Sequence, residues 1–401
     1  MKICVVGLGY IGLPTAVVLA NSGHNVQGFD INKRYVKDLQ SGKHSLVEKG
    51  FDEALHLAIS SGMLSFHDTI QPADTFIVAV STNLNKKTKK IDLSYLKSAV
   101  KAIKSVLKDG NLVIIESTVT PGTTLNLVNP ILDTSDTLYH LAFCPERVLP
   151  GNLMEEMVRN DRIIGGIDQA STDKAKAVYA SFCKGKLHET DPLTAEMAKL
   201  MENTYRAVNI ALANELALIS EKAGGDVWRA IALANNHPRV HIHSPGPGVG
   251  GYCLTKDPYF LAENTRAPLI RNALLINSLM PAHIVSLARG ILGPLKGKKV
   301  GILGLAYKGN VSDARESPGA VIHDLLKKSK ALVRIHDPFV TQFNGLKPET
   351  DLQAILAWAD LVILVTEHSE YAKIDPASLK PVLLDTRNLL PRTGRNRLLG
   401  A

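Results

Sequence analysis

A cysteine lies in a segment whose neighbours suit reactive chemistry, GVGGYCLTKDPYF at residues 249–261. Cys253 follows a glycine-rich run and precedes Lys256 and Asp257. The thiolate is the nucleophilic form of cysteine, and a nearby lysine favours it. Such a thiolate attacks an aldehyde carbonyl, and the resulting thiohemiacetal can lose a hydride to become a thioester that water cleaves. Because free cysteines are usually small buried hydrophobes, a packed loop cysteine is the alternative from this pattern alone.

A polar face on an expected helix offers partners for that chemistry. In the helix expected to begin at residue 192, the residues Glu196, Lys199 and Asn203 fall on one face. A lysine and an asparagine aligned in this way can stabilise an oxyanion and position a water molecule. A solvated polar face is the ordinary alternative, and helix geometry alone leaves both interpretations open.

The segment GLGYIG at residues 7–12 is a complete G-x-G-x-x-G motif between an expected strand at 2–6 and an expected helix at about 11–22. In this setting Gly7 permits the tight turn, Gly9 lets a pyrophosphate approach the backbone, and Gly12 lets the helix pack on the strand. The amino end of the helix supplies amide donors and positive potential for the diphosphate. The context therefore predicts a dinucleotide site.

The second strand of this unit, expected at 25–30, ends in an acidic residue that bears on the choice of dinucleotide. Asp30 would accept hydrogen bonds from the adenosine ribose hydroxyls, which favours NAD over NADP. Lys33 and Arg34 follow closely and could serve a 2′-phosphate, so NADP remains the alternative. A glycine turn of purely structural use is the less favoured interpretation.

The elements that would position these residues alternate between strand and helix. Further strands are expected at 75–80, 112–116, 138–143 and 162–165, with a helix at 93–107. This alternation indicates a doubly wound parallel sheet. A long amphipathic helix then runs from 192 to the glycine pair Gly224–Gly225, and more helical sequence follows to about 290.

Alternation resumes at 299, with strands expected there and at 332–338, 361–367 and 382–388. We therefore predict an α/β protein with two Rossmann-like doubly wound parallel-sheet domains joined by a central helical region. The expected domains are a dinucleotide-binding domain at 1–190, a helical dimerisation and catalytic-loop region at 191–290, and a second Rossmann-like domain at 291–401.

The second glycine turn, GILGLAYKGN, lacks the middle glycine because Ala306 follows Gly301 and Gly304 at the third position. A dinucleotide is therefore less favoured in this unit, although its second strand also ends in an aspartate, Asp337. Nearby cations leave a helix-terminus site that could hold another diphosphate, and a solvated loop is the alternative. These cations are Lys299, Lys308 and Arg315.

Bulk properties bound the class of protein. A chain of 401 residues with 45% hydrophobic and 21% charged residues suits two or three globular domains. Four scattered cysteines with no CxxC pair indicate a reduced, cytoplasmic setting. The net charge of +8 favours anionic small molecules, since no basic helix with interleaved aromatics suggests nucleic acid.

Neither a membrane nor a metal is expected from these patterns. No apolar run reaches the ~18 residues that a membrane span needs. The apolar start of the chain is interrupted by glycines where a strand–turn–helix would need them, so we interpret it as mature structure rather than a signal peptide. The histidines of HPRVHIH at 237–243 lack a metal-ligand pattern such as HExxH.

Seven segments together resemble motifs of the UDP-glucose/GDP-mannose dehydrogenase family over essentially the whole chain. They are GLGYIGLP at 7–14, ESTVTPGTT at 116–124, CPERVLPG at 144–151, NDRIIGG at 160–166, TAEMAKLMENTYRAVNIALANE at 194–215, GPGVGGYCLTKDP at 246–258 and AYKGNVSDARESP at 306–318. The resemblance implies a four-electron oxidation of a sugar C6 alcohol to a carboxylate, with two NAD⁺ and no metal. It implies a UDP-N-acetylhexosamine substrate, with N-acetylmannosamine as the preferred sugar and N-acetylglucosamine or glucose as alternatives.

The resemblance also implies roles for individual residues. Cys253 is the expected nucleophile, and Lys199 and Asn203 are expected to stabilise the oxyanion and order the water, with Asp257 helping Lys199 or the water. Thr118 and Glu146 are expected near the C6 hydroxyl and the hydrolytic water. NAD contacts are expected from Gly7, Gly9, Tyr10, Ile11, Gly12, Asp30, Thr82, Thr118 and Arg315. Substrate contacts are expected from Glu146, Arg147, Val148, Lys199, Asn203, Arg239, Gly250 and Lys308. The long helix is expected to build a homodimer.

Two departures from the family pattern bear on the sugar and on the cofactor loop. Tyr252 precedes the cysteine where many enzymes for N-acetylated sugars have histidine, and VSTN at 80–83 replaces the usual V-P-T-P.

Two other functions remain as alternatives to this dehydrogenase. A β-hydroxyacid-type dehydrogenase shares the first domain but needs neither a nucleophilic cysteine nor a second α/β unit, and a non-catalytic NAD or nucleotide-sugar-binding protein would need no turnover.

Overall fold

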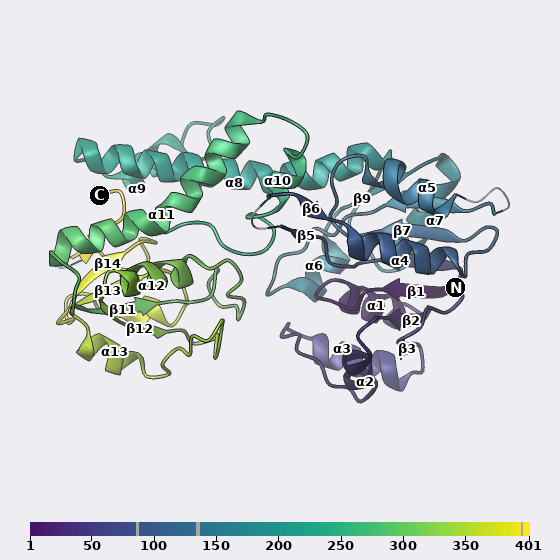
Figure 1. Cartoon of the computed structure of the whole chain (residues 1–401), viewed down its shortest axis with the longest axis horizontal. Helices are drawn as coiled ribbons and strands as arrows, with labels where there is room; N and C mark the ends of the chain where they lie inside the picture. The colour runs from purple at the N-terminus through teal and green to yellow at the C-terminus, as the bar shows by residue number, and fades with distance from the viewer. Residues whose placement is uncertain (86–87, 134–136, 394–395) are drawn as a thin grey trace. The chain divides into compact units, whose positions relative to one another are not determined.

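The computed structural model describes residues 1–85, 88–133, 137–393 and 396–401. The chain divides into two compact units, Met1–Met201 and Glu202–Ala401, and each holds one large sheet (Figure 1). The boundary between the units falls within the long helix α8 (Pro192–Ala223). The predicted fold class is confirmed, since each unit has a doubly wound sheet with helices between its strands.

The described part of the first unit contains an eight-stranded sheet in the order β10-β9-β8-β7-β4-β1-β2-β3. Its strands are β1 (Lys2–Val6), β2 (Asn25–Phe29), β3 (Leu64–His67), β4 (Thr75–Val78), β7 (Leu112–Ile115), β8 (His140–Phe143), β9 (Arg162–Gly166) and β10 (Leu187–Thr190). Its helices are α1 (Gly12–Asn21), α2 (Lys33–Gln40), α3 (Phe51–Ser60), α4 (Ser94–Lys104), the π-helix η1 (Thr124–Val128), α5 (Asn129–Leu132), α6 (Leu153–Arg159) and α7 (Gln169–Ala180). A short hairpin joins β5 (Asn83–Leu84) to β6 (Ile91–Asp92).

Alternate side chains of β1 enter cores on the two faces of this sheet, as the period of a strand requires. Ile3 and Val5 pack with residues of α1, α3 and α7, whereas Cys4 and Val6 pack with residues of α4. Both faces are therefore covered by helices, which explains why the central strands are continuous apolar runs.

One pairing in the first sheet departs from the expected parallel arrangement. β8 and β9 are antiparallel, with Ala142 opposite Gly166 and Phe143 opposite Gly165. Antiparallel neighbours need no crossover to the far edge of the sheet. The segment between them, which contains CPERVLPG and α6, therefore begins and ends at the carboxyl edge of β8, where open α/β sheets bind ligands.

The second unit contains a parallel sheet in the order β12-β11-β13-β14-β15 within its described residues. Its strands are β11 (Lys299–Leu303), β12 (Leu332–His336), β13 (Leu361–Leu364), β14 (Val382–Asp385) and β15 (Asn396–Leu398). Its helices, besides most of α8, are α9 (Val227–Ala234), α10 (Asp257–Leu261), α11 (Pro268–Leu292), α12 (Pro318–Lys328), α13 (Leu352–Trp358) and the 3-10 helix η2 (Tyr371–Lys373). Val300 and Ile302 pack with α11 and α12, and Leu303 packs with α13 on the other face.

The long helix ends where its sequence predicts. Gly224 adopts a φ of 70°, and the Gly225 N–H donates to the Ser220 carbonyl at 2.9 Å. A glycine in the left-handed region closes a helix without the steric cost that a side chain would bring there. The predicted end at Gly224–Gly225 is confirmed.

Candidate active site

The first glycine turn is built by close backbone contacts. Gly7 has a φ of 90°, and its N–H donates to the Phe29 carbonyl at 2.8 Å. A Cβ on Gly12 would lie 1.8 Å from the Gly7 carbonyl oxygen, so no larger residue fits without moving the backbone. These contacts bring the start of α1 directly against the end of β1, as the motif predicts.

The space above this turn fits the diphosphate of a dinucleotide. A Cβ on Gly9 would have no described atom within 4 Å, so the backbone there is open to a ligand. Among the described residues, the amino end of α1 has no side-chain cap and no acidic residue in its first turn. The Leu13 N–H donates to the Gly9 carbonyl at 3.2 Å and the Thr15 N–H to the Ile11 carbonyl at 3.0 Å, so an anion would meet the backbone of the glycine turn before Leu13. The helix dipole favours an anion there.

Asp30 keeps acceptor capacity for a ribose. Its Oδ2 accepts the Leu8 N–H at 3.0 Å and its Oδ1 accepts the Asn32 N–H at 2.9 Å. A carboxylate offers about four lone-pair positions, so part of this capacity stays unused. Lys33 and Arg34 are exposed at the start of α2, on the solvent side of the same corner.

Tyr10 joins the glycine turn to the segment that follows β8. Its hydroxyl donates to Glu48, and the same carboxylate accepts the Gly151 N–H at 3.0 Å. Ile11, beside it, packs against the core under α1. Within the first unit, the predicted cofactor residues therefore share a hydrogen-bonded frame with the CPERVLPG segment.

The loops after β4 and β7 meet at two predicted residues. Thr82 is buried, and its hydroxyl donates to the Thr118 carbonyl at 2.7 Å. The next turn is held by Glu196, whose carboxylate accepts the N–H groups of Gly122 at 2.5 Å and Thr124 at 2.8 Å. Glu196, one of the three polar residues that the sequence placed on one face of the long helix, is thus buried and anchors this loop.

The CPERVLPG segment presents its predicted residues at the carboxyl edge of β8. Glu146 is buried, and its Oε1 accepts the Arg147 N–H at 2.7 Å. The Arg147 guanidinium donates to the Asp161 carbonyl at 3.0 Å, and Val148 packs on the core of this unit. The carboxylate of Glu146 also pairs with Arg162 at 2.7 Å, a residue that motif spacing did not single out.

Three predicted catalytic residues meet in the second unit. Asn203 Nδ2 donates to Asp257 Oδ2 at 2.7 Å, and both residues are buried. The Asp257 N–H donates to the Cys253 carbonyl at 2.8 Å, so the carboxylate starts α10 one turn beyond the cysteine. Lys199, partly exposed, lies one turn before Asn203 on α8. The structure thus pairs Asp257 with Asn203, a contact that the sequence did not indicate.

Glycines let the cysteine loop lie directly on the segment between β11 and α12. The Gly251 N–H donates to the Arg315 carbonyl at 2.9 Å, and Gly251 has a φ of 82°. A Cβ on Gly251 would lie 2.8 Å from the ring of Tyr307, and one on Gly250 would lie 2.9 Å from the Glu316 carbonyl oxygen. A side chain at either position would therefore push the loop away from its support.

Two cations lie around the ring of Tyr252, the residue next to Cys253, and one of them, Lys256, is buried. Lys256 Nζ lies 4.1 Å from the centroid of the Tyr252 ring, and the Arg315 guanidinium carbon lies 5.2 Å from it. Cys253 itself is exposed. By contrast, Cys4 is buried, and burial raises the pKa of its thiol to about 12. An exposed thiol beside cations differs from a packed core cysteine and suits a nucleophile.

The second glycine turn has the same close backbone contact between strand and helix as the first, but it lacks an open space like the one beside Gly9. Gly304 has a φ of 105°, and a Cβ on Gly319 would lie 2.5 Å from the Gly304 carbonyl oxygen. The segment 305–318 is inserted between these two glycines. Asp337 Oδ2 accepts the N–H groups of Leu305 at 2.6 Å and Ala306 at 2.7 Å.

Hydrogen bonds saturate Asp337. Its Oδ1 accepts the N–H groups of Phe339 and Val340, each at 2.8 Å, and His368 Nε2 lies 3.1 Å from its Oδ2. Although burial opposes it, these donors lower the pKa of Asp337 to about 2. No lone pair remains for a ribose, which agrees with the prediction that this unit is less suited to a dinucleotide.

Lys308 lies on a firmly anchored part of the inserted segment. The next residue, Gly309, approaches so closely that its Cβ would lie 2.2 Å from the Glu367 carbonyl oxygen. The Asn310 N–H donates to His368 Nδ1 at 3.0 Å. The backbone that carries Lys308 is therefore held against the loop that follows β13.

Arg239 lies apart from the residues that the structure brings together in the second unit. It is exposed, in the loop after α9, and its N–H donates to His237 Nδ1 at 3.3 Å. The rings of His241 and His243 meet edge to face at 5.5 Å. Among the described residues, no group of three or more His, Cys, Asp or Glu side chains is arranged to hold a metal ion.

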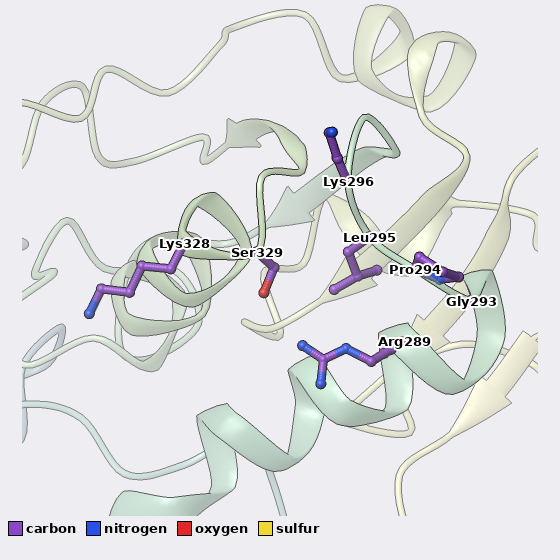
Figure 2. Close-up of a pocket in the computed structure, with 7 residues that line it drawn as sticks. All are labelled: Arg289, Gly293, Pro294, Leu295, Lys296, Lys328 and Ser329. Atoms are coloured by element: carbon purple, nitrogen blue, oxygen red, sulfur yellow. The ribbon is translucent and has the colours of Figure 1, made fainter.

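A basic pocket in the second unit lies away from these residues (Figure 2). It has a volume of about 670 Å³. Cations at the carboxyl ends of α11 and α12 offset the helix dipoles there, so their presence has a structural explanation. The pocket is lined by Arg289, Gly293, Pro294, Leu295, Lys296, Lys328 and Ser329.

The glycine turn and the aspartate at the end of β2 are typical of a dinucleotide-dependent oxidoreductase, and the exposed Cys253 is a candidate nucleophile. Models of three parts of one family match in order: the NAD binding domain at residues 1–183, the central domain at 193–279 and the UDP binding domain at 301–392. The chain belongs to the UDP-glucose/GDP-mannose dehydrogenase family. It is therefore an NAD-dependent dehydrogenase with a UDP-binding domain for its nucleotide-sugar substrate.

Close relatives cover nearly the whole chain. A UDP-N-acetyl-D-mannosamine dehydrogenase of Methanocaldococcus jannaschii is 44% identical, over 98% of this chain and 93% of the relative. The solved UDP-N-acetyl-mannosamine dehydrogenase of Staphylococcus aureus is 41% identical with a TM-score of 0.91, and the match covers 100% of this chain and 98% of that one. A solved UDP-glucose dehydrogenase of Pyrobaculum islandicum has the same TM-score of 0.91 at 30% identity, covering 99% and 96%.

Sequence reasoning missed two residues of the first unit that bear on the site, Glu116 and Arg162. Both are buried, and Arg162 pairs with Glu146. Glu116 directly follows β7 and Arg162 is the first residue of β9, within the quoted segments ESTVTPGTT and NDRIIGG. A charged residue next to a buried strand was the available signal, because such a residue is almost never buried without a partner.

Proposed function

We propose that the enzyme oxidises UDP-N-acetyl-D-mannosamine at C6 to the uronic acid, removing four electrons with two NAD⁺. The observation that carries the chemistry is the exposed Cys253 thiol placed one turn before the buried Asp257–Asn203 pair. The relatives support the sugar, since those at 44% identity are named for this substrate. UDP-N-acetylglucosamine and UDP-glucose are the alternative substrates.

Cys253 holds the aldehyde between the two oxidations. Its thiolate sulfur bonds to the C6 aldehyde carbon to give a thiohemiacetal, whose oxidation leaves a thioester. NAD⁺ supplies the hydride acceptor for each oxidation. Water then adds to the thioester carbon, the carbon–sulfur bond breaks, and the thiolate and the carboxylate are released. Covalent capture keeps the reactive aldehyde from escaping before the second oxidation.

The remaining catalytic roles follow the motifs that each residue matches. Lys199 and Asn203 stabilise the oxyanion and order the water. The charged Asp257 fixes the orientation of the Asn203 amide through their 2.7 Å hydrogen bond. Thr118 and Glu146 serve the C6 hydroxyl and the hydrolytic water, with Glu146 accepting a proton.

The other predicted contacts concern the nucleotides and the sugar. Lys308 and Arg315 serve the nucleotides, and Arg239 reaches the sugar of a neighbouring subunit. In the first unit, Arg147 and Val148 flank Glu146 at the substrate. Gly250 lets the backbone approach the ligand closely.

We propose that the enzyme is a homodimer built on α8. Apolar side chains recur along one side of this helix at spacings of four and seven residues and are exposed in the single chain: Met201 at 48%, Tyr205 at 53%, Leu212 at 45% and Ile219 at 58%. Such a stripe is typical of a helix that packs against another chain. Light scattering at several protein concentrations tests the dimer.

We propose a cytoplasmic location. Among the described residues, α11 is the one helix long and apolar enough to cross a membrane, which is weak evidence because core helices pass the same test. Its Met280, Ile284 and Ala288 belong to the core of the second unit. Fractionation of cells that express the tagged chain tests this location.

NADH production against a panel of UDP-sugars tests the proposed function. We expect two NADH per sugar with UDP-N-acetylmannosamine, slower turnover with UDP-N-acetylglucosamine and UDP-glucose, and no free aldehyde. Cys253→Ala should abolish acid formation while NAD and UDP still bind. One NADH per sugar with released aldehyde would refute the mechanism, and ligand binding without turnover by the wild-type chain would favour a sensor.

A further inference from the structure

Three elements of the first unit bring charged side chains together out of contact with water. Glu116 follows β7, Glu146 follows β8, and Arg162 begins β9. Arg162 Nη2 donates to Glu146 Oε2 at 2.7 Å, and its Nη1 lies 3.5 Å from Glu116 Oε1. The side chains of Arg162, Glu116 and Glu146 are 4%, 0% and 8% exposed. One guanidinium thus lies between two carboxylates.

Neutral donors and an aromatic ring hold this group on its other sides. Thr15, on α1, donates to Glu116 Oε2 at 3.1 Å, and Tyr179, on α7, donates to Glu116 Oε1 at 2.9 Å. The Arg162 guanidinium carbon lies 4.8 Å from the centroid of the Tyr179 ring. The chain of contacts therefore runs from the cofactor helix through Glu116 and Arg162 to Glu146.

Glu146 is held at both of its oxygens. Arg162 binds Oε2, and the Arg147 N–H donates to Oε1 at 2.7 Å. The guanidinium is fixed in turn by its stacking on Tyr179 and by the charge of Glu116. A carboxylate held in this way has one orientation toward its surroundings, which general-base catalysis requires.

We propose that Arg162 is a positioning residue for Glu146, and that Glu116 divides the charge of Arg162 between two carboxylates. The inference rests on the proposed function, in which Glu146 serves the hydrolytic water. In that step the water oxygen bonds to the thioester carbon, one water proton passes to Glu146, and the electrons of the carbon–sulfur bond return to the Cys253 thiolate.

The charges predict different effects for two substitutions. Burial raises the pKa of Glu116 to about 7, with Arg162 opposing the shift and Glu146 adding to it. Below pH 7 the protonated Glu116 no longer competes with Glu146 for the charge of Arg162, so removing Glu116 changes little there. Removing Arg162 leaves Glu146 without its cation at every pH. The groups that face Glu116 from the surrounding elements are Thr15, Cys144, Glu146, Arg162 and Tyr179.

The test reads kcat against pH for the full-length enzyme, saturated with UDP-N-acetylmannosamine and NAD. Because Glu116, with its pKa raised to about 7, is already mostly protonated over the acid limb of the profile, Glu116→Gln should leave that limb within about half a unit of the wild type. In Arg162→Met, it should move to higher pH by about one unit, and kcat at neutral pH should fall at least tenfold. Arg162→Lys keeps the positive charge, but its ammonium group cannot contact both carboxylates as the guanidinium does. The acid limb should therefore move to higher pH by less than in Arg162→Met.

A second readout separates positioning from general structural damage. Slower thioester hydrolysis lets the sugar adduct on Cys253 accumulate, and mass spectrometry of acid-quenched enzyme detects it. We expect the adduct in Arg162→Lys and in Glu146→Gln. Should Arg162→Met fail to fold, Glu116→Gln and Arg162→Lys still carry the test, since both keep close to the native shape.

The matched control removes an arginine near the same segment. Arg159, on α6, pairs with Glu155 at the surface with its side chain 73% exposed, and Arg159→Met should keep the wild-type profile. An unchanged acid limb and no adduct in Arg162→Lys would overturn the inference, as would an acid limb in Glu116→Gln that moves by one unit or more. A wild-type rate in Glu146→Gln would overturn it too. Two NADH per sugar from Cys253→Ala would instead overturn the proposed function.

Discussion

Two glycines of one turn should respond to alanine in opposite ways. A Cβ on Gly12 would lie 1.8 Å from the Gly7 carbonyl oxygen, whereas a Cβ on Gly9 would have no described atom within 4 Å. Gly12→Ala therefore forces rigid backbone apart, which costs about 1–3 kcal/mol in overpacked sites. Gly9→Ala should change the free energy of unfolding by less than about 0.5 kcal/mol, as at other open positions.

Gly9→Ala, which should have the smaller effect on stability, should have the larger direct effect on NAD binding. In Gly9→Ala the added methyl group occupies the space through which the diphosphate approaches the backbone. Losing one amide-to-phosphate hydrogen bond costs about 1.5–3 kcal/mol, which is roughly a 10- to 150-fold rise in the Kd for NAD. Gly12→Ala should lower the melting temperature of the first unit by roughly 2–12 °C.

The assay measures thermal unfolding with and without NAD and titrates the cofactor by NADH fluorescence. We expect Gly9→Ala to melt like the wild type without NAD and to gain little stability when NAD is added. Wild-type NAD affinity in Gly9→Ala would refute the assignment of that open space to the diphosphate. A wild-type melting temperature in Gly12→Ala would refute the close approach of helix and strand.

Three further predictions concern single carboxylates. Asp30→Ser should lower the ratio of kcat/KM with NAD to kcat/KM with NADP at least tenfold. The ribose of NAD loses its carboxylate acceptor, while the exposed Lys33 and Arg34 remain beside the site for a 2′-phosphate. Asp257→Asn removes a charge-assisted hydrogen bond to Asn203, so kcat should fall about 10- to 100-fold while calorimetry shows unchanged UDP binding. Asp337, with its pKa lowered to about 2, contributes stability that is present above pH 4 and is lost as pH falls through 2. Urea unfolding at pH 5 and pH 2 should show that the wild type loses about 2 kcal/mol more than Asp337→Asn, and equal losses would refute this.

The sequence was sufficient for the elements that lie inside the sheets. β7 is apolar throughout, and β1 and β4 are apolar after their first residues, Lys2 and Thr75. These apolar runs are buried on both faces of the sheet, which is why their composition identifies them as strands. β10 at the sheet edge has a mostly exposed pattern, and β15 spans three residues, so neither carries a recognisable strand signal. Their strand conformation depends on pairing with a neighbour, which only the folded chain supplies.

In the candidate site too, features within one short segment could be predicted from the sequence, whereas contacts between separate elements could not. The glycine turn and the Cys253–Asp257 spacing are local, and the motif predicted both. The pair of Arg162 with Glu146 joins residues on separate elements, and its geometry follows from the antiparallel contact of β8 with β9. That contact reverses the expected direction of a strand, and no pattern within either strand indicates it.

The aspartates at the ends of β2 and β12 show how the same fold can lose its place for a ribose when the carboxylate accepts hydrogen bonds from the protein instead. Asp30 gives two of its lone pairs to the backbone and keeps the others, whereas Asp337 gives all of them to the protein itself. The acceptor positions that a nucleotide ribose would use are filled in the second unit partly by the inserted segment 305–318, through Leu305 and Ala306. The remaining partners are the N–H groups of Phe339 and Val340 and the ring of His368. The inserted segment in turn supports the cysteine loop through Tyr307 and Arg315. Mutations that lengthen or shorten the segment 305–318 could therefore change the position of Cys253 without replacing any residue of the cysteine loop.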